Sequence, residues 1–197
     1  MSPKDLTTIP KAPGRHLPGE AGIWILVFGD MVMFSIFFTV FALAQSQEMQ
    51  VFTQARTLLN PWFGLANTIL LVSASWFVAT GVKKFRAGGS GNVQLYFLLG
   101  LLCGVGFVIN KVFEWGEKFR AGITPATNDF FMYYFIFTGI HLVHVFLGLG
   151  VLTYMRGVSR RATPGPNDLR NLESGATFWH LVDLLWIVLF AILYLAR

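Results

Sequence analysis

Long apolar runs alternate with short polar segments along almost the whole chain. Five runs are nearly free of charged side chains, and each is at least 20 residues long. They are residues 22–45, 62–82, 93–115, 131–155 and 176–196. A helix rises ~1.5 Å per residue, so about 20 residues cross ~30 Å of hydrocarbon. Because lipid cannot hydrogen-bond a bare backbone, the runs predict an all-α fold, a polytopic bundle of five transmembrane helices.

The polar segments between the runs carry residues that start helices. Asn60 and Pro61 precede the second run, where they favour a helix start. Asn128 or Asp129 is expected to cap the fourth helix. No connection is long enough to fold as a separate domain.

Composition agrees with a membrane protein and explains the positive charge. The chain is 54% hydrophobic and only 13% charged, whereas an ordinary soluble domain carries about 25% charged residues. We divide the chain into an N-terminal segment, 1–21, which has no recognisable signal peptide, and a transmembrane domain, 22–197. The net charge of +5 comes from basic residues in the connections. Membrane topology accounts for them better than binding to nucleic acid does.

The basic residues predict an orientation. On the side of the N-terminus and of the second and fourth connections lie Lys4, Lys11, Arg15, Lys83, Lys84, Arg86, Arg156, Arg160, Arg161 and Arg170. On the other side lie Arg56, Lys118, Arg120 and Arg197. Ten against four predicts a cytoplasmic N-terminus and an external C-terminus.

Charged and imidazole side chains inside the runs need an explanation, because the bilayer disfavours them. Asp30 lies about 12 Å inside the first run and should be protonated, paired or turned to a polar cavity. In the third run, Lys111 and Glu114 are three residues apart and so lie on one side of the helix. The same spacing relates two further pairs. They are His141 and His144 in the fourth run, and His180 and Asp183 in the fifth.

Small residues predict where helices pack closely. Gly100 and Gly104 form a GxxxG pair, which we assign with Asn67 to helix packing. A homodimer face remains an alternative use of the glycine pair. Aromatic residues near the ends of the runs are interpreted as rings at the membrane interface. They are Trp24, Trp62, Tyr96, Trp115, Tyr133, Tyr134, Tyr154, Trp179 and Tyr194.

Three interpretations of the buried polar residues stay open on these features alone. The first is interhelical hydrogen bonding, and the second is a lipid-headgroup pocket or a proton relay. The third is a metal or haem site, which we disfavour. A haem–copper centre needs about twice as many histidines as the membrane runs hold, and Cys103 is the chain's one cysteine. We predict no metal and no catalytic residue in this chain.

Four motifs, in order, resemble subunit III of haem–copper oxidases. Residues 179–186, WHLVDLLW, resemble the family's WHxVDxxW motif, and residues 138–145, TGIHLVHV, resemble its TGxHxxHV motif. Residues 67–75, NTILLVSAS, and 113–117, FEWGE, are similar to its NTxxLLxSS and EYxE stretches. Asp30 falls where the family has an acidic residue followed by aromatic residues. The chain resembles the short form with five helices, whereas many members have seven.

The resemblance implies a membrane subunit without redox centres of its own. Haem and copper would lie in a partner, the catalytic subunit I. The chain would bind phospholipid and support proton uptake and stability of the complex in a bacterial cytoplasmic membrane, with its C-terminus in the periplasm. Asp30 and Glu114 would be the lipid- or proton-related residues. The buried polar network joining the last two helices would be His141, His144, His180 and Asp183.

Other functions remain open at this stage. Residues 118–124 and 128–135 resemble the homologues that accompany bacterial nitric oxide reductases, so an accessory subunit or assembly factor of such an enzyme is the first alternative. A free-standing transporter or proton channel is the second. It would need a continuous polar path, yet Asp30 and Glu114 lie toward opposite ends of the predicted helices. The electron donor, the lipid and the stoichiometry are not specified by the sequence.

Overall fold

The computed structural model describes residues 19–88, 92–161, 165 and 167–196. The helices are α1 (Ala21–Gln47), α2 (Met49–Thr57), α3 (Pro61–Arg86), α4 (Val93–Arg120), α5 (Asp129–Val158), α6 (Asp168–Phe190) and the π-helix η1 (Ala191–Leu195). No strand occurs in these residues. Most of the predicted N-terminal segment 1–21 lies outside the described residues, as do Lys4, Lys11, Arg15 and Arg197 of the orientation count.

The prediction of five membrane-spanning helices is confirmed. Five helices are long and apolar enough to span a membrane. They are Gly22–Gln47, Pro61–Arg86, Val93–Arg120, Asp129–Val158 and Asp168–Leu195. Most extend beyond the predicted runs, because their last turns continue into polar residues that hydropathy alone excludes.

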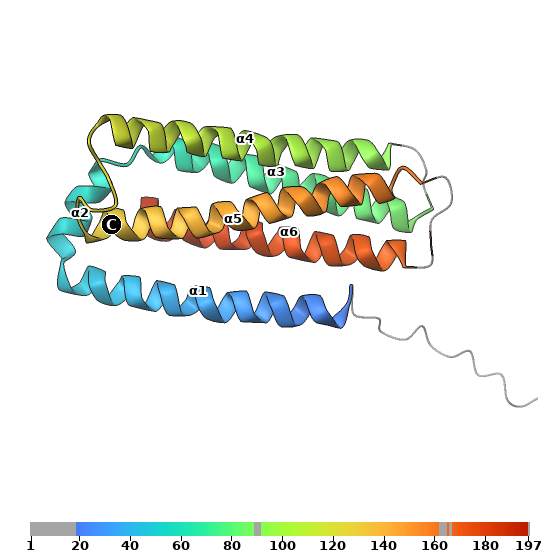
Figure 1. Ribbon diagram of the computed structural model, residues 1–197, viewed down its shortest axis with the longest axis horizontal. Helices are drawn as coiled ribbons and strands as arrows, with labels where there is room; N and C mark the ends of the chain where they lie inside the picture. The colour runs from blue at the N-terminus through green and yellow to red at the C-terminus, as the bar shows by residue number, and fades with distance from the viewer. Residues whose placement is uncertain (1–18, 89–91, 162–164, 166, 197) are drawn as a thin grey trace, which may run out of the picture.

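Four helices form a bundle, and the first helix lies along its side (Figure 1). Helices α3 to α6 pack together, while α1 runs beside α5 and α6 and leads into the short α2. The start of α1 and the α3–α4 and α5–α6 connections share one end, which we call the basic end. It carries Lys83, Lys84, Arg86, Arg156, Arg160, Arg161 and Arg170. Helix α2, the α4–α5 connection and the described C-terminal residues lie at the opposite end, which we call the α2 end (Figure 1).

The predicted helix start at Asn60 and Pro61 and the predicted cap of the fourth membrane helix are confirmed. The side-chain oxygen of Asn60 accepts a hydrogen bond from the backbone N–H of Trp62 at 3.0 Å, and Pro61 begins α3. The side chain of Asn128 accepts from the N–H of Phe131 at 2.9 Å, so Asn128 caps α5, not Asp129. Each cap satisfies a backbone donor that the first turn of a helix leaves unpaired.

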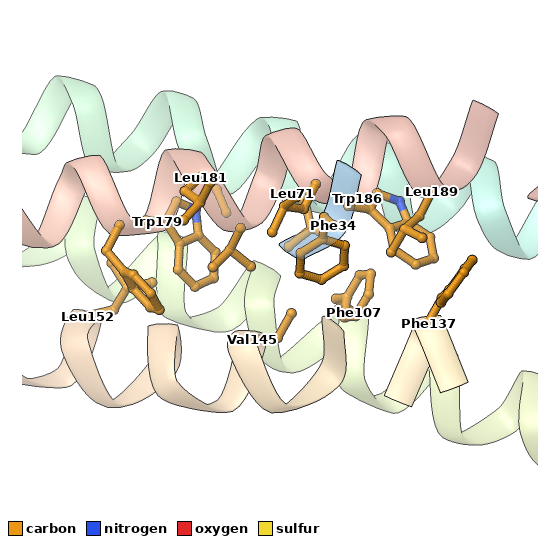
Figure 2. Close-up of a cluster of buried hydrophobic side chains, with 14 of the residues drawn as sticks. Phe34, Leu71, Phe107, Phe137, Val145, Leu152, Trp179, Leu181, Trp186 and Leu189 are labelled. Atoms are coloured by element: carbon orange, nitrogen blue, oxygen red, sulfur yellow. The ribbon is translucent and has the colours of Figure 1, made fainter. Parts of the chain in front are cut away.

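The centre of the bundle is packed around tryptophan rings (Figure 2). Trp179, predicted to lie at the membrane interface, is instead fully buried, and its ring lies against Gly104 of α4 and Gly148 of α5. A Cβ at Gly148 would lie 2.9 Å from two carbons of this ring. The glycines therefore let three helices approach around one large side chain, the close packing that small residues permit in membranes. Gly100, one turn from Gly104, faces Val78 of α3.

Helix α1 is attached to the bundle near both of its ends. At the basic end, the backbone N–H of Glu20 donates to Ser174 Oγ at 2.9 Å, and the Glu20 carboxylate pairs with Arg170 at 2.9 Å. At the α2 end, the ring of Phe41 packs against Phe52 of α2 at 5.3 Å between centroids. Phe34 and Phe41 are the buried side chains of α1 among its described residues. Most of this helix faces outward.

Candidate functional site

The predicted pair in α4 is the centre of a closed cluster, which we call the Lys111 cluster and which comprises Lys111, Glu114, Tyr134 and Tyr194. The ammonium of Lys111 lies 2.9 Å from Glu114 Oε2, and both side chains are at most 1% exposed. Tyr134 donates to Glu114 Oε1 at 2.8 Å, and the hydroxyl of Tyr194 donates to the same oxygen. Lys111 in turn donates to both tyrosine oxygens.

The tyrosines of the Lys111 cluster were missed because rings near helix ends usually lie at the membrane interface. Both rings are instead turned inward, and the Lys111 ammonium lies over them and over Trp186 at 4.9 to 5.7 Å from the centroids. Such contacts stabilise a desolvated cation. Tyr194 belongs to η1, whose wider turn cannot be inferred from the composition of the run.

Asp30 meets His144 of α5 across the gap between α1 and the bundle. Asp30 Oδ2 lies 3.3 Å from His144 Nε2, and both side chains are partly exposed. The other ring nitrogen, Nδ1, lies 2.9 Å from the carbonyl oxygen of Ile140. A carbonyl can only accept, so Nδ1 carries a hydrogen and donates it.

This geometry allows the Asp30–His144 pair to hold a proton. In a neutral ring with hydrogen on Nδ1, Nε2 has only a lone pair to offer. An ionised carboxylate also has only lone pairs, so the two atoms would repel. The contact is attractive either as imidazolium with carboxylate or as neutral imidazole with carboxylic acid. Both forms contain one more proton than the two groups have in their unprotonated states.

A third polar group, which we call the His180 triad, comprises Ser75 of α3 with His180 and Asp183 of α6. The Ser75 hydroxyl lies 2.7 Å from His180 Nδ1 and also interacts with Asp183. Asp183 is 8% exposed, and its Oδ1 has no hydrogen-bond partner among the described residues. His180 is exposed on the outer surface of the bundle.

His141 stands apart from the other predicted network residues. It is completely buried, and neither ring nitrogen has a hydrogen-bond partner within the described part of the chain. Its ring lies between Phe107 and Trp186, at 5.6 and 5.3 Å between centroids. The four residues predicted as one network therefore occupy three places: His144 faces α1, His180 and Asp183 face α3, and His141 lies among rings.

Asn67 has a partner that the sequence analysis missed. Asn110 of α4 donates to Asn67 Oδ1 at 2.8 Å and to the carbonyl oxygen of Phe63 at 3.1 Å. Asn67 is fully buried, so this amide pair links α3 and α4 inside the bundle. Asn110 could have been predicted as a partner, because it is a polar amide inside an apolar run.

Grooves on the surface of the bundle lie beside these groups. One, of about 490 Å³, lies between α1, α5 and α6, and Leu26, Leu147 and Phe178 are among its apolar walls. A second, of about 430 Å³, runs between α3 and α6 from Arg86 and Glu173 at the basic end to His180. At the α2 end, a third cavity of about 460 Å³ is lined by Arg56 and Tyr194, and burial lowers the pKa of Arg56.

The polar residues do not form a metal site in the described part of the chain, where no three histidine, cysteine or carboxylate side chains gather as ligands would. The arrangement can hold one proton at Asp30 and His144, stabilise a buried charge pair at Lys111 and Glu114, and offer acceptors at the His180 triad.

Comparisons with known proteins agree with this arrangement. Residues 16–196 match the family described as "Cytochrome c oxidase subunit III". The chain is 26% identical over 177 residues to "Cytochrome bo(3) ubiquinol oxidase subunit 3" of Buchnera aphidicola subsp. Schizaphis graminum, covering 88% of this chain and 92% of the relative. It is 28% identical over 182 residues to "Quinol oxidase subunit 3" of Bacillus spizizenii, covering 88% and 85%. It is 26% identical over 196 residues to "Cytochrome c oxidase subunit 3" of Bacillus sp. strain PS3, covering 95% and 93%.

Proposed function

The chain belongs to the cytochrome c oxidase subunit III family, and we propose that it supports proton uptake and stability of a haem–copper oxidase without carrying a redox centre. Membership makes it a non-catalytic membrane subunit of a terminal oxidase, and the named relatives give no support to the nitric oxide reductase alternative. Haem and copper would lie in the catalytic subunit. The transporter alternative finds no support either, because the polar groups are separated by packed apolar side chains.

The observation that carries the proposal is the contact of Asp30 Oδ2 with His144 Nε2 at 3.3 Å, where a proton can be held. The two side chains are partly exposed, so the proton can exchange with water or a partner surface, unlike one in the closed Lys111 cluster. Asp30 is nine residues from the start of α1 at Ala21, about 14 Å along the helix from the basic end. An acidic group at this depth is suited to accept a proton and pass it on.

The orientation follows from the charge distribution. The basic end carries the excess of lysine and arginine, so we place it on the cytoplasmic side of a bacterial cytoplasmic membrane and the α2 end in the periplasm. Asp30 then lies in the cytoplasmic half of the bilayer, the side from which a terminal oxidase must take its protons.

We assign the groove between α1, α5 and α6 to phospholipid. Its walls are apolar, while Glu20, Tyr154 and Asn171 supply polar groups at its mouth near the basic end. An acyl chain in the groove with a headgroup at the mouth would match this distribution. The groove also begins one helical turn from the Asp30–His144 pair, at Leu26 and Leu147, so lipid would limit access of water to the pair. Bound lipid would add mass to the subunit in native mass spectrometry.

The Asp30→Asn variant is expected to assemble normally but to lose activity faster during turnover. Asparagine has nearly the same shape and its amide can donate to His144 Nε2, so the α1–α5 contact survives while the exchangeable proton is lost. Oxygen consumption by the purified complex, followed until activity decays, should show a several-fold shorter active lifetime. A matched control is Ser35→Ala on the outward face of α1, where the hydroxyl bonds only the carbonyl oxygen of Met31. Equal lifetimes for Asp30→Asn and the parent would remove the proposed role of Asp30.

A further inference from the structure

The His180 triad lies near the middle of the membrane and faces outward. Ser75 is close to the midpoint of α3, and His180 and Asp183 are close to the midpoint of the span Asp168–Leu195. His180 is exposed on the surface and Asp183 Oδ1 lacks a donor among the described residues. Acyl chains have no hydrogen-bonding groups, so a triad facing lipid alone would leave polar atoms unsatisfied at several kcal/mol each.

The hydrogen-bond directions show what the triad needs. The Ser75 hydroxyl interacts with both the His180 ring and the Asp183 carboxylate. One ring nitrogen of His180, Nδ1, is therefore satisfied by Ser75 within this chain. The other, Nε2, has no hydrogen-bond partner among the described residues, and His180 is exposed, so Nε2 needs a partner from outside the chain. Asp183 Oδ1 is buried and lies out of reach of such a partner.

The surroundings favour a helix as the source of this hydrogen-bond partner. Small side chains, Ala79, Ala176 and Thr177, line the part of the groove of about 430 Å³ that leads from Arg86 and Glu173 to His180. Small residues allow another helix to approach closely in a membrane. A lipid headgroup is an unsuitable partner for His180, because headgroups lie at the bilayer surface, about 15 Å from the midplane. Apolar Trp76, Leu184 and Ile187, all more than 40% exposed, flank the triad and would be covered by the same contact.

We propose that the α3–α6 face centred on the His180 triad packs against a membrane helix of the catalytic subunit, which supplies a hydrogen-bonding side chain to His180. The inference rests on the proposed function, since it takes the partner to be the catalytic subunit of the oxidase. The inference specifies which face of this chain contacts the catalytic subunit and that the partner helix carries a hydrogen-bonding side chain there.

Site-specific photo-crosslinking in the assembled complex tests the proposal. The photoreactive amino acid p-benzoylphenylalanine is placed at Trp76 or Ile187 on the α3–α6 face, and at Leu102 or Ile109 on the outward face of α4 as matched controls. All four side chains are exposed in the isolated subunit. Crosslinks to the catalytic subunit are expected from Trp76 and Ile187 and not from the α4 positions.

The outcomes separate the inference from the function on which it rests. Crosslinks to the catalytic subunit from α4 alone would overturn the assignment of the face and leave the proposed function intact. No crosslink to a haem protein from any position would contradict both. Crosslinks from Trp76 or Ile187 to a second copy of this chain, or to lipid only, would also overturn the assignment.

A second measurement uses substitutions within the triad. His180→Leu removes the exposed ring, and Asp183→Asn replaces the buried carboxylate beside Ser75 and His180, so each should lower severalfold the amount of this subunit that stays with the complex through detergent washes. Thr153→Val is the control, because Thr153 is exposed on α5 and its hydroxyl bonds only the carbonyl oxygen of Leu149. We expect the complex to lose the His180→Leu and Asp183→Asn subunits during the washes and to retain the Thr153→Val subunit. Full retention of both triad variants would overturn the proposal.

Discussion

Glu114→Gln is expected to destabilise the bundle by about 3–5 kcal/mol, because it leaves the ammonium of Lys111 without a countercharge inside the bundle. Lys111 and Glu114 are almost completely buried, and Tyr194, which bonds Glu114, lines the cavity at the α2 end. A domain's total stability is ~5–15 kcal/mol, so the loss would be a large fraction of it. The purified complex should retain little of the variant subunit, measured as the subunit ratio after mild heating.

The paired variant Lys111→Met with Glu114→Leu is the control for this prediction. Both charges are then removed, and the hydroxyls of Tyr134 and Tyr194, which already interact, can bond each other. Replacing both members of a buried ion pair by apolar residues is often neutral or stabilising. Retention of the double variant should therefore exceed that of Glu114→Gln. If Glu114→Gln were as stable as the parent, the account of the Lys111 cluster as a closed charge pair would be wrong.

Gly148→Leu is the second substitution with a large expected effect. A Cβ at this position would lie 2.9 Å from two carbons of the Trp179 ring, closer than real Cβ atoms approach, and a whole leucine side chain has no room. Overpacking of this kind costs about 1–3 kcal/mol or more. The melting temperature of the subunit within the purified complex should fall, and its retention should fall with it.

Gly150→Leu provides a matched control on the same helix. No heavy atom lies within 4 Å of a Cβ built at Gly150, and leucine favours a helix over glycine, so this variant should be neutral or slightly more stable. The double variant Gly148→Leu with Trp179→Leu should recover part of the lost stability, because removal of the Trp179 ring leaves space for the leucine at position 148. Equal melting temperatures for Gly148→Leu and Gly150→Leu would contradict the packing described for Trp179.

The sequence predicted the helices because membrane helices need long apolar runs regardless of their neighbours. The caps at Asn60 and Asn128 were predictable for a similarly local reason, since a capping side chain bonds to its own helix. Helix α2 was not predicted. Its nine residues are largely polar, and only Phe52 and Ala55 are buried, so its formation depends on packing of the Phe52 ring against α5.

The partners of the polar side chains could not be predicted in the same way. In a soluble helix the apolar face marks the interior, but a membrane helix is apolar on its lipid-facing side as well, so the pattern does not show which way a residue points. His141 and His144 are three residues apart, so a helix of about 3.6 residues per turn points their side chains about 60° apart. This is enough to place His141 between Phe107 and Trp186 and to turn His144 toward Asp30.

The central claim is that this chain is a redox-inert partner of a haem-containing catalytic subunit. The most direct measurement is native mass spectrometry of the complex purified through a tag on this chain, followed by release of the 22.0 kDa subunit in the gas phase. The account predicts one complex that contains a haem protein, and a released subunit whose mass is that of the polypeptide plus phospholipid. A chain that purifies without any haem protein, or a released subunit that carries iron or copper, would contradict it.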